Sequence, residues 1–173
     1  MSAESAISIA VMGVQGVGKS TLGALLAERL EVPFVDGDSL HPARNIELMA
    51  SGTPLTDADR APWLDAVGKV LAESPGRGVV VACSALRRSY RDVLREHDPR
   101  VYFVEPWAPI ELVSERIASR THEYMPPALL RSQYDMLEPL AADERGIRVS
   151  VVSSPEEIVA EALAAYSQTG APL

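Results

Sequence analysis

Eight residues near the N-terminus have the types and spacing needed to hold a chain of phosphates. Gly13 to Ser20 read GVQGVGKS and fit the pattern G-x-x-x-x-G-K-[ST], directly after the apolar run AISIAVM. A glycine-rich turn between a strand and a helix lets backbone N–H groups surround phosphate oxygens, and the helix N-terminus adds partial positive charge. Lys19 can reach the β- and γ-phosphates, and the Ser20 hydroxyl is suited to ligate Mg²⁺. The predicted nucleotide contacts are Gly13, Gln15, Gly16, Val17, Gly18, Lys19, Ser20 and Thr21.

Two carboxylates follow the second strand-like run, at Asp36-Gly37-Asp38. Gly37 breaks the strand alternation, so both acids can approach the phosphate site. One carboxylate near Mg²⁺ can hold the ion through water, and the other can accept the proton of an attacking hydroxyl. We therefore assign Asp36 to the metal and Asp38 to general base catalysis. A tight turn with an Asx-type hydrogen bond is the alternative interpretation of this triplet.

Five apolar, strand-like runs alternate with segments of helical spacing. They cover residues 6–12, 33–36, 78–82, 100–105 and 146–152. Strands that are almost uninterruptedly Val, Ile and Ala are typical of a parallel sheet that helices cover on both faces, with ligands beyond its carboxyl edge. The pattern predicts an α/β fold with a five-stranded parallel sheet, formed by a single domain over residues 1–173.

The composition argues against several classes of partner and of protein. The chain has 24 acidic and 16 basic residues, a net charge of −8, which disfavours nucleic acid and anionic membrane surfaces as partners. The single cysteine, Cys83, excludes an internal disulfide framework. No segment approaches the roughly twenty apolar residues of a membrane span, and the N-terminus lacks the features of a secretory signal. We expect a cytoplasmic protein.

Three longer stretches resemble one kinase family. Residues 36–64 (DGDSLHPARNIELMASGTPLTDADRAPWL), 83–94 (CSALRRSYRDVL) and 122–139 (HEYMPPALLRSQYDMLEP) are similar to the signature of the gluconokinases, which have the P-loop kinase fold. The resemblance implies a three-layer, nucleotide-kinase-like fold with a small helical lid over about residues 121–139. It also implies transfer of the γ-phosphoryl of ATP to the 6-hydroxyl of D-gluconate, a requirement for Mg²⁺, and a homodimer.

The polar residues of the first stretch suit such an acceptor. Gluconate offers a carboxylate and a row of hydroxyls, which Arg, His and Asn recognise better than an apolar pocket does. The predicted acceptor-binding residues are Asp38, His41, Arg44, Asn45, Arg60, Arg87 and His122. Pro62 is expected in the first turn of the next helix, with Trp63 packed beneath it.

Several arginines lie on the helices that follow the third and fourth strands. We expect Ser84 to cap the helix that carries Arg87, and we expect Arg91 and Arg95 to form ion pairs on a solvated face. Arg116 and Arg120 are four residues apart, so they share a helical face and can reach the phosphates when the lid closes. Arg120 is the predicted catalytic cation; salt bridges to Glu115 or Glu123 are the alternative.

Other functions stay open. A kinase of shikimate, of another small hydroxy acid or of a nucleoside monophosphate uses the same architecture. A regulatory NTP-binding switch is the candidate from another class, but it predicts an N-K-x-D motif, which is absent, and a D-x-x-G motif after the third strand, where this chain has CSAL. The chain departs from the family at Thr121, where Gly is usual, and at Leu48, which is often Lys. The missing cation at position 48 is expected to change the affinity for the acceptor or the polyol acid that is preferred.

Overall fold

The computed structural model describes residues 6–120, 126–171 and 173. Five strands form one parallel sheet in the order β2-β3-β1-β4-β5. They are β1 (Ile7–Val11), β2 (Phe34–Asp36), β3 (Gly78–Ala82), β4 (Tyr102–Trp107) and β5 (Gly146–Ser150). The predicted α/β class with a five-stranded parallel sheet is confirmed, and each strand overlaps the run that predicted it.

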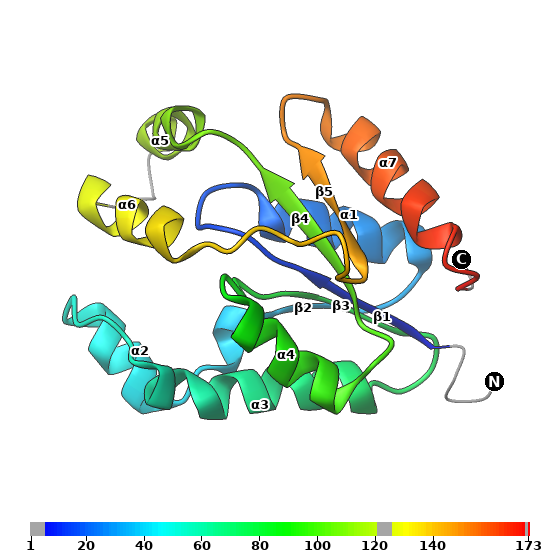
Figure 1. Cartoon of the computed structure of the whole chain (residues 1–173), viewed down its shortest axis with the longest axis horizontal. Coiled ribbons are helices and arrows are strands. Elements are labelled where there is room, and N and C mark those ends of the chain that lie inside the picture. Colours follow the sequence, from blue (N-terminus) through cyan, green and yellow to red (C-terminus); the bar gives the residue numbers. More distant parts are fainter. Residues whose placement is uncertain (1–5, 121–125, 172) are drawn as a thin grey trace.

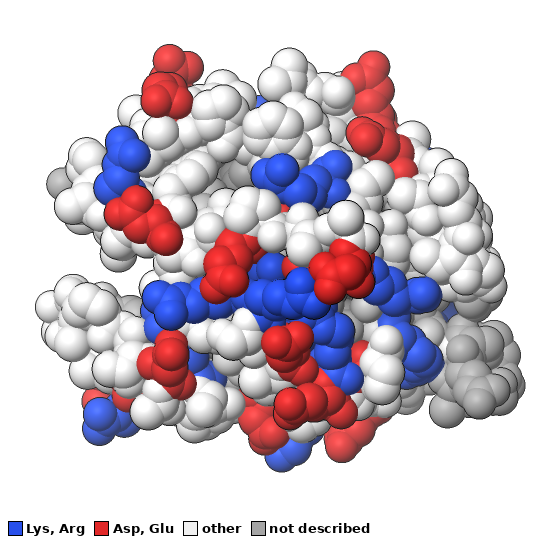
Figure 2. Space-filling model, viewed as in Figure 1, with Lys and Arg blue, Asp and Glu red and all other residues white. Residues whose placement is uncertain are grey.

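Helices cover both faces of the sheet (Figure 1). One face carries α1 (Lys19–Leu30) and α7 (Pro155–Ser167), and the other carries α3 (Asp57–Glu73) and α4 (Arg88–His97). The remaining helices lie at the carboxyl edge; they are α2 (Ala43–Ala50), α5 (Ile110–Ser119), α6 (Pro127–Met136) and a 3₁₀ turn, η2 (Gly37–Leu40). In Figure 1, α2 and α6 lie opposite each other, and Figure 2 shows the surface hollowed between them. Among the described residues, no helix combines the length and the apolar character that crossing a bilayer requires.

The central strand β1 separates two apolar cores. Ile7, Ile9 and Val11 pack with α1 and α7, whereas Ala10 and Met12 pack with α3 and α4. Successive residues of a strand point to opposite faces, so a strand that is apolar at most of its positions packs against both cores at once. This pattern explains why β1 and β3 are buried along their whole length.

The strand register brings the chemical motifs to one edge. Val11 pairs with Ala82 and with Val104, and Asp36 also pairs with Ala82. The glycine-rich loop after β1 and the two acids at the end of β2 therefore leave the sheet at the same level. A Cβ at Gly37 would collide with the carbonyl of Ala82, so this position needs glycine because two backbones approach closely.

Two predicted helix starts are wrong. Helix α3 begins at Asp57, and Pro62 lies inside it; Thr56 and Asp59 form a capping box that starts the helix earlier. Helix α4 begins at Arg88 with Arg87 as its N-cap, and no side chain caps it, so Ser84 is not the cap.

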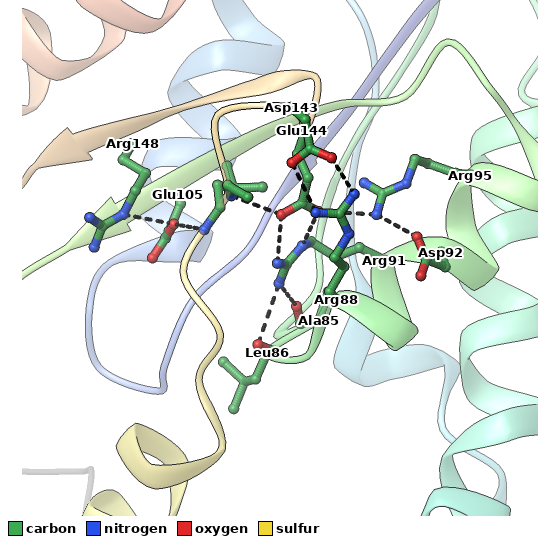
Figure 3. A network of polar contacts seen from close by, with 12 residues as sticks. Ala85, Leu86, Arg88, Arg91, Asp92, Arg95, Glu105, Asp143, Glu144 and Arg148 are labelled. Carbon is green, nitrogen blue, oxygen red and sulfur yellow. Dashed lines mark hydrogen bonds and ion pairs between the residues drawn. The ribbon is translucent and has the colours of Figure 1, made fainter.

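A buried ion-pair network fastens the segment after α6 to α4 (Figure 3). Arg91 is fully buried and makes two 2.8 Å bonds to Glu144, so the expectation that it lies on a solvated face is wrong. Arg95 pairs with Asp92 as predicted, and also with Glu144. Figure 2 shows a band of Lys and Arg side chains interleaved with acids on this face of the molecule. Its cations are thus largely neutralised by neighbouring carboxylates.

Candidate active site

The glycine-rich loop has the backbone conformation of a phosphate cradle. Gly13, Gly16 and Gly18 all have positive φ angles, of 138°, 82° and 105°. Gly18 is the N-cap of α1 and contributes no side chain, so the first N–H groups of the helix keep no intrahelical or capping acceptor. These donors and the helix dipole make the loop a site for an anion.

Lys19 lies within this loop. Its ammonium group donates a 2.9 Å hydrogen bond to the carbonyl of Val14. Burial lowers the pKa of Lys19, while the nearby Asp38, Cys83 and Asp36 oppose that shift. A cation held against the cradle and close to both acids can neutralise phosphate charge where the two substrates meet.

Helix α6 reaches the same loop through Gln133, a residue that the sequence analysis did not identify. Its side-chain carbonyl accepts a 2.7 Å hydrogen bond from the N–H of Gln15. The next residue, Tyr134, donates to the carbonyl of Ala108 at 2.8 Å, and Glu138 N–H donates to Leu86 at 2.8 Å. Helix α6 and the residues after it are thereby attached to three loops at the carboxyl edge. Only the fold brings Gln133 to Gln15, because 118 positions separate them.

The two acids lie at the start of η2. Asp36 is its N-cap, and Asp36 Oδ1 accepts a 3.0 Å hydrogen bond from Asp38 N–H. The Asx-type turn weighed as an alternative is therefore present. It does not conflict with the predicted roles, because both side chains are exposed and close to Lys19. Trp63 donates a 2.8 Å bond to the carbonyl of Gly37 and holds this turn against α3.

His41 stacks on Trp63, with ring centroids 4.2 Å apart and planes inclined by 13°. Burial lowers the pKa of His41; nearby Asp38 opposes this effect and Arg60 reinforces it. At neutral pH the imidazole is consequently uncharged. It is a hydrogen-bonding group rather than a cation.

Asn45 lies between His41 and the backbone of α3. Its side chain is buried, and its amide nitrogen pairs with His41 and with the carbonyl of Asp59. The contact between this side chain and an acceptor remains a prediction. The two hydrogen bonds of the amide nitrogen show in addition that Asn45 supports His41.

The three predicted acceptor-binding arginines differ in the contacts that hold their side chains. Arg60 donates to Tyr90 Oη at 3.2 Å and lies 5.5 Å from the centre of that ring, while Tyr90 donates to Asp57 at 2.6 Å. Arg44 is exposed and lies 3.5 Å from Asp59. Arg87 is exposed at the N-cap of α4. Arg60 is thus held in place by α3 and α4, and Tyr90 is a second residue that the sequence analysis missed.

The predicted phosphate-binding arginines lie at the end of α5. Arg116 donates a 3.0 Å bond to the carbonyl of Val151, just after β5, and so faces the β5–α7 loop. Arg120 is the C-cap of α5 and is exposed. His122 lies outside the described residues. The roles assigned to these three side chains remain predictions.

A pocket of about 310 Å³ lies beside the loop. Its lining includes Gly13, Val14, Trp107 and Tyr134, but neither Asp38 nor His41. It therefore lies between the loop, β4 and α6 rather than between the acids and α2. Within the part of the chain that the structure describes, no three His, Cys, Asp or Glu side chains gather as a metal site.

Comparisons with known proteins agree with this arrangement. The shikimate kinase family model matches residues 15–165. A gluconokinase from Gluconobacter oxydans (strain 621H) is 44% identical over 155 residues, covering 88% of this chain and 87% of the relative. The thermosensitive gluconokinase of Escherichia coli (strain K12) is 42% identical over 143 residues, covering 81% and 76%.

A solved structure of a gluconokinase also matches this chain. The crystal structure of a gluconokinase from Sinorhizobium meliloti 1021 superposes with a TM-score of 0.86 at 47% identity, covering 94% of this chain and 92% of that one. The P-loop kinase fold implied by the sequence resemblance is thus confirmed. The shikimate kinase model names a related kinase family, whereas the relatives with identities of 42–47% are gluconokinases. The chain belongs to the gluconokinase family of P-loop kinases.

Proposed function

We propose that this chain transfers the γ-phosphoryl group of ATP to the 6-hydroxyl of D-gluconate, giving 6-phosphogluconate and ADP. The observation that carries the proposal is the meeting of the phosphate-binding loop, Asp38 and the polar set around His41 at one sheet edge. The choice of gluconate is supported by relatives that are 42–44% identical over most of the chain.

The nucleotide phosphates bind to the N–H groups of the loop and of the first turn of α1, with Lys19 beside the β- and γ-phosphates. Ser20 and Asp36 are the residues that would hold Mg²⁺. The ion would neutralise charge on the phosphate oxygens. Arg116 and Arg120 would contribute further positive charge from the end of α5, with Arg120 next to the transferring group.

Asp38 is the proposed general base. Its carboxylate accepts the proton of the 6-hydroxyl as that oxygen forms a bond to the γ-phosphorus, and the bond between the γ-phosphorus and the bridging oxygen breaks to release ADP. Asp38 lies close enough to Lys19 for its charge to act on the pKa of the ammonium group. The base and the phosphate-binding cation therefore flank one position. Both substrates are thereby held for direct transfer.

Recognition of gluconate is assigned to the groups on the α2 side of the cleft. Arg60 is the best candidate for the carboxylate, because Tyr90 and Asp57 fix its guanidinium. Arg44, Arg87 and His122 are proposed to complete the site. Residues 121–139, which include α6, are proposed to close over it as a lid in a single domain spanning 1–173.

A coupled assay of ADP release tests the proposal. ATP and Mg²⁺ are supplied with D-gluconate, shikimate, a nucleoside monophosphate or no acceptor, for the wild type and for Asp38→Asn. We expect turnover that depends on gluconate and falls at least about 100-fold in the variant. Equal slow hydrolysis in every reaction would refute the kinase assignment and favour an NTP-binding switch.

Shikimate is the second candidate acceptor, because the shikimate kinase family model matches residues 15–165. Turnover with shikimate alone would replace gluconate by this acid without changing the reaction type. We also propose that the chain acts as a homodimer in the cytoplasm. Light scattering on the purified protein tests the dimer, and a monomeric mass would exclude it.

A further inference from the structure

The side chain of Asn45 links the backbone of α3 to the imidazole of His41. Asn45 Nδ2 lies 2.8 Å from the carbonyl oxygen of Asp59 and 3.1 Å from His41 Nδ1. Asn45 is only 2% exposed, so these contacts are shielded from water. Both distances are in the range of hydrogen bonds.

The orientation of the amide follows from the first contact. A backbone carbonyl is only an acceptor, so the atom of Asn45 that faces Asp59 must be the NH₂ group and not the oxygen. The NH₂ group has two hydrogens. One is donated to Asp59, and the other points at His41 Nδ1.

The form of His41 follows from the second contact. A nitrogen that accepts a hydrogen bond cannot carry a hydrogen, so His41 is the neutral tautomer with its hydrogen on Nε2. An imidazolium would place an N–H of the ring against an N–H of the amide. Stacking on Trp63 holds the plane of the ring, and Trp63 is itself held by the carbonyl of Gly37. Among the described residues, no acceptor pairs with Nε2–H.

We infer that Asn45 is a positioning residue that fixes His41 as a neutral Nε2–H donor for a hydroxyl oxygen of the acceptor. This inference rests on the proposed function, because it names the kind of acceptor atom that His41 recognises. The carboxylate of the acceptor is then bound by the arginines of the site. The charged groups that act on the ring are Asp38, which favours its protonation, and Arg60, which disfavours it.

The tautomer can be measured without any substrate. Long-range ¹H–¹⁵N correlation spectra distinguish the two tautomers of a neutral imidazole, and the chain has only three histidines. The signals of His41 are identified by their loss in His41→Gln. We expect an unprotonated Nδ1 and a protonated Nε2 at neutral pH. A protonated Nδ1 in the wild type would overturn the inference, whatever the enzyme phosphorylates.

The Asn45→Asp variant reverses the hydrogen bond. A carboxylate can only accept, so it takes a hydrogen from His41 Nδ1 and raises the pKa of the ring. Above that pKa the neutral ring has no hydrogen on Nε2. We therefore expect the KM for gluconate to rise about tenfold between about pH 6 and about pH 9 in Asn45→Asp, and to stay level in the wild type.

The matched control is Ala50→Asp, which adds the same charge at an exposed position of α2. It should leave the KM profile and the His41 spectrum unchanged. If Asn45→Asp keeps the tautomer and the KM profile of the wild type, Asn45 has only a structural role. If Asn45→Asp does not fold, the wild-type spectrum alone decides the assignment of the tautomer.

Discussion

The ion pair of Arg91 and Glu144 offers the strongest test of how the fold supports the site. Arg91 is fully buried and donates to both oxygens of Glu144 at 2.8 Å, and to the carbonyl of Ala85 at 3.0 Å (Figure 3). Glu144 also accepts from Ala141 N–H and pairs with Arg95 at 3.0 Å. This network joins α4, whose N-cap is Arg87, to the segment that follows α6.

Arg91→Met leaves a buried carboxylate without its main partner. Breaking a buried pair in this way costs about 3–5 kcal/mol of unfolding free energy. Because Arg95 and Ala141 still hold Glu144, we expect a loss of about 3 kcal/mol, a large share of the usual total of about 5–15 kcal/mol. Urea denaturation at neutral pH measures the loss.

The double variant Arg91→Met/Glu144→Met supplies the control. It removes both charges, so most of the lost stability should return, to within about 1 kcal/mol of the wild type. If Arg91→Met costs less than about 1 kcal/mol, or if the double variant is no more stable than the single one, the pair does not hold these elements together.

The same pair predicts how stability depends on pH. Burial opposes ionisation of Glu144, but the hydrogen bonds from Arg91 and Ala141 and the nearby arginine charges outweigh it and bring its pKa to about 2. This pKa lies below the ordinary value of 4.5, so the stabilisation is present above about pH 4.5 and is lost as the pH falls towards 2. The gap corresponds to about 3 kcal/mol. In the double variant, the unfolding free energy should therefore change less between about pH 4.5 and about pH 2 than in the wild type.

Two further predictions concern the phosphate-binding loop. Gln133→Ala removes the acceptor of Gln15 N–H and should raise the KM for ATP about fivefold while leaving that for gluconate unchanged; steady-state kinetics that show equal changes in both constants would contradict a specific role at the loop. Gly16→Ala should lower the melting temperature more than Gly18→Ala, because both positions have positive φ but only a Cβ at Gly16 meets Ile117, at 2.8 Å. Equal melting temperatures would show that α5 yields to the added methyl group.

Much of the site could be read from local patterns. GVQGVGKS between an apolar run and a helical segment fixes a strand–loop–helix unit, because its glycines permit backbone angles that other residues avoid. The acids at positions 36 and 38 follow a strand, and parallel strands end at a common edge. Both motifs were therefore predicted correctly in their place in the fold, although the catalytic roles of their side chains still await the assays above.

Some contacts of the structure have no local signal in the sequence. Arg91 has the same sequence surroundings as its exposed neighbours, and only the segment after α6 buries it by delivering Glu144. The hydrogen bond between Asn45 and the backbone of α3 likewise has no local signal, because it joins residues 14 positions apart. The early start of α3, by contrast, had a local signal that the sequence analysis did not use, the capping box of Thr56 and Asp59.

The sequence by itself determined the fold class, the order of the motifs and the edge at which they meet, because strand periodicity, glycine geometry and helix N-termini act over a few residues. The tertiary structure decided which polar side chains remain available for a ligand and which are bound to the protein. That choice depends on distances between segments far apart in the chain, such as the 118 positions between Gln15 and Gln133. Burial strengthens such contacts, which can then fix a tautomer, shift a pKa or hold an ion pair together.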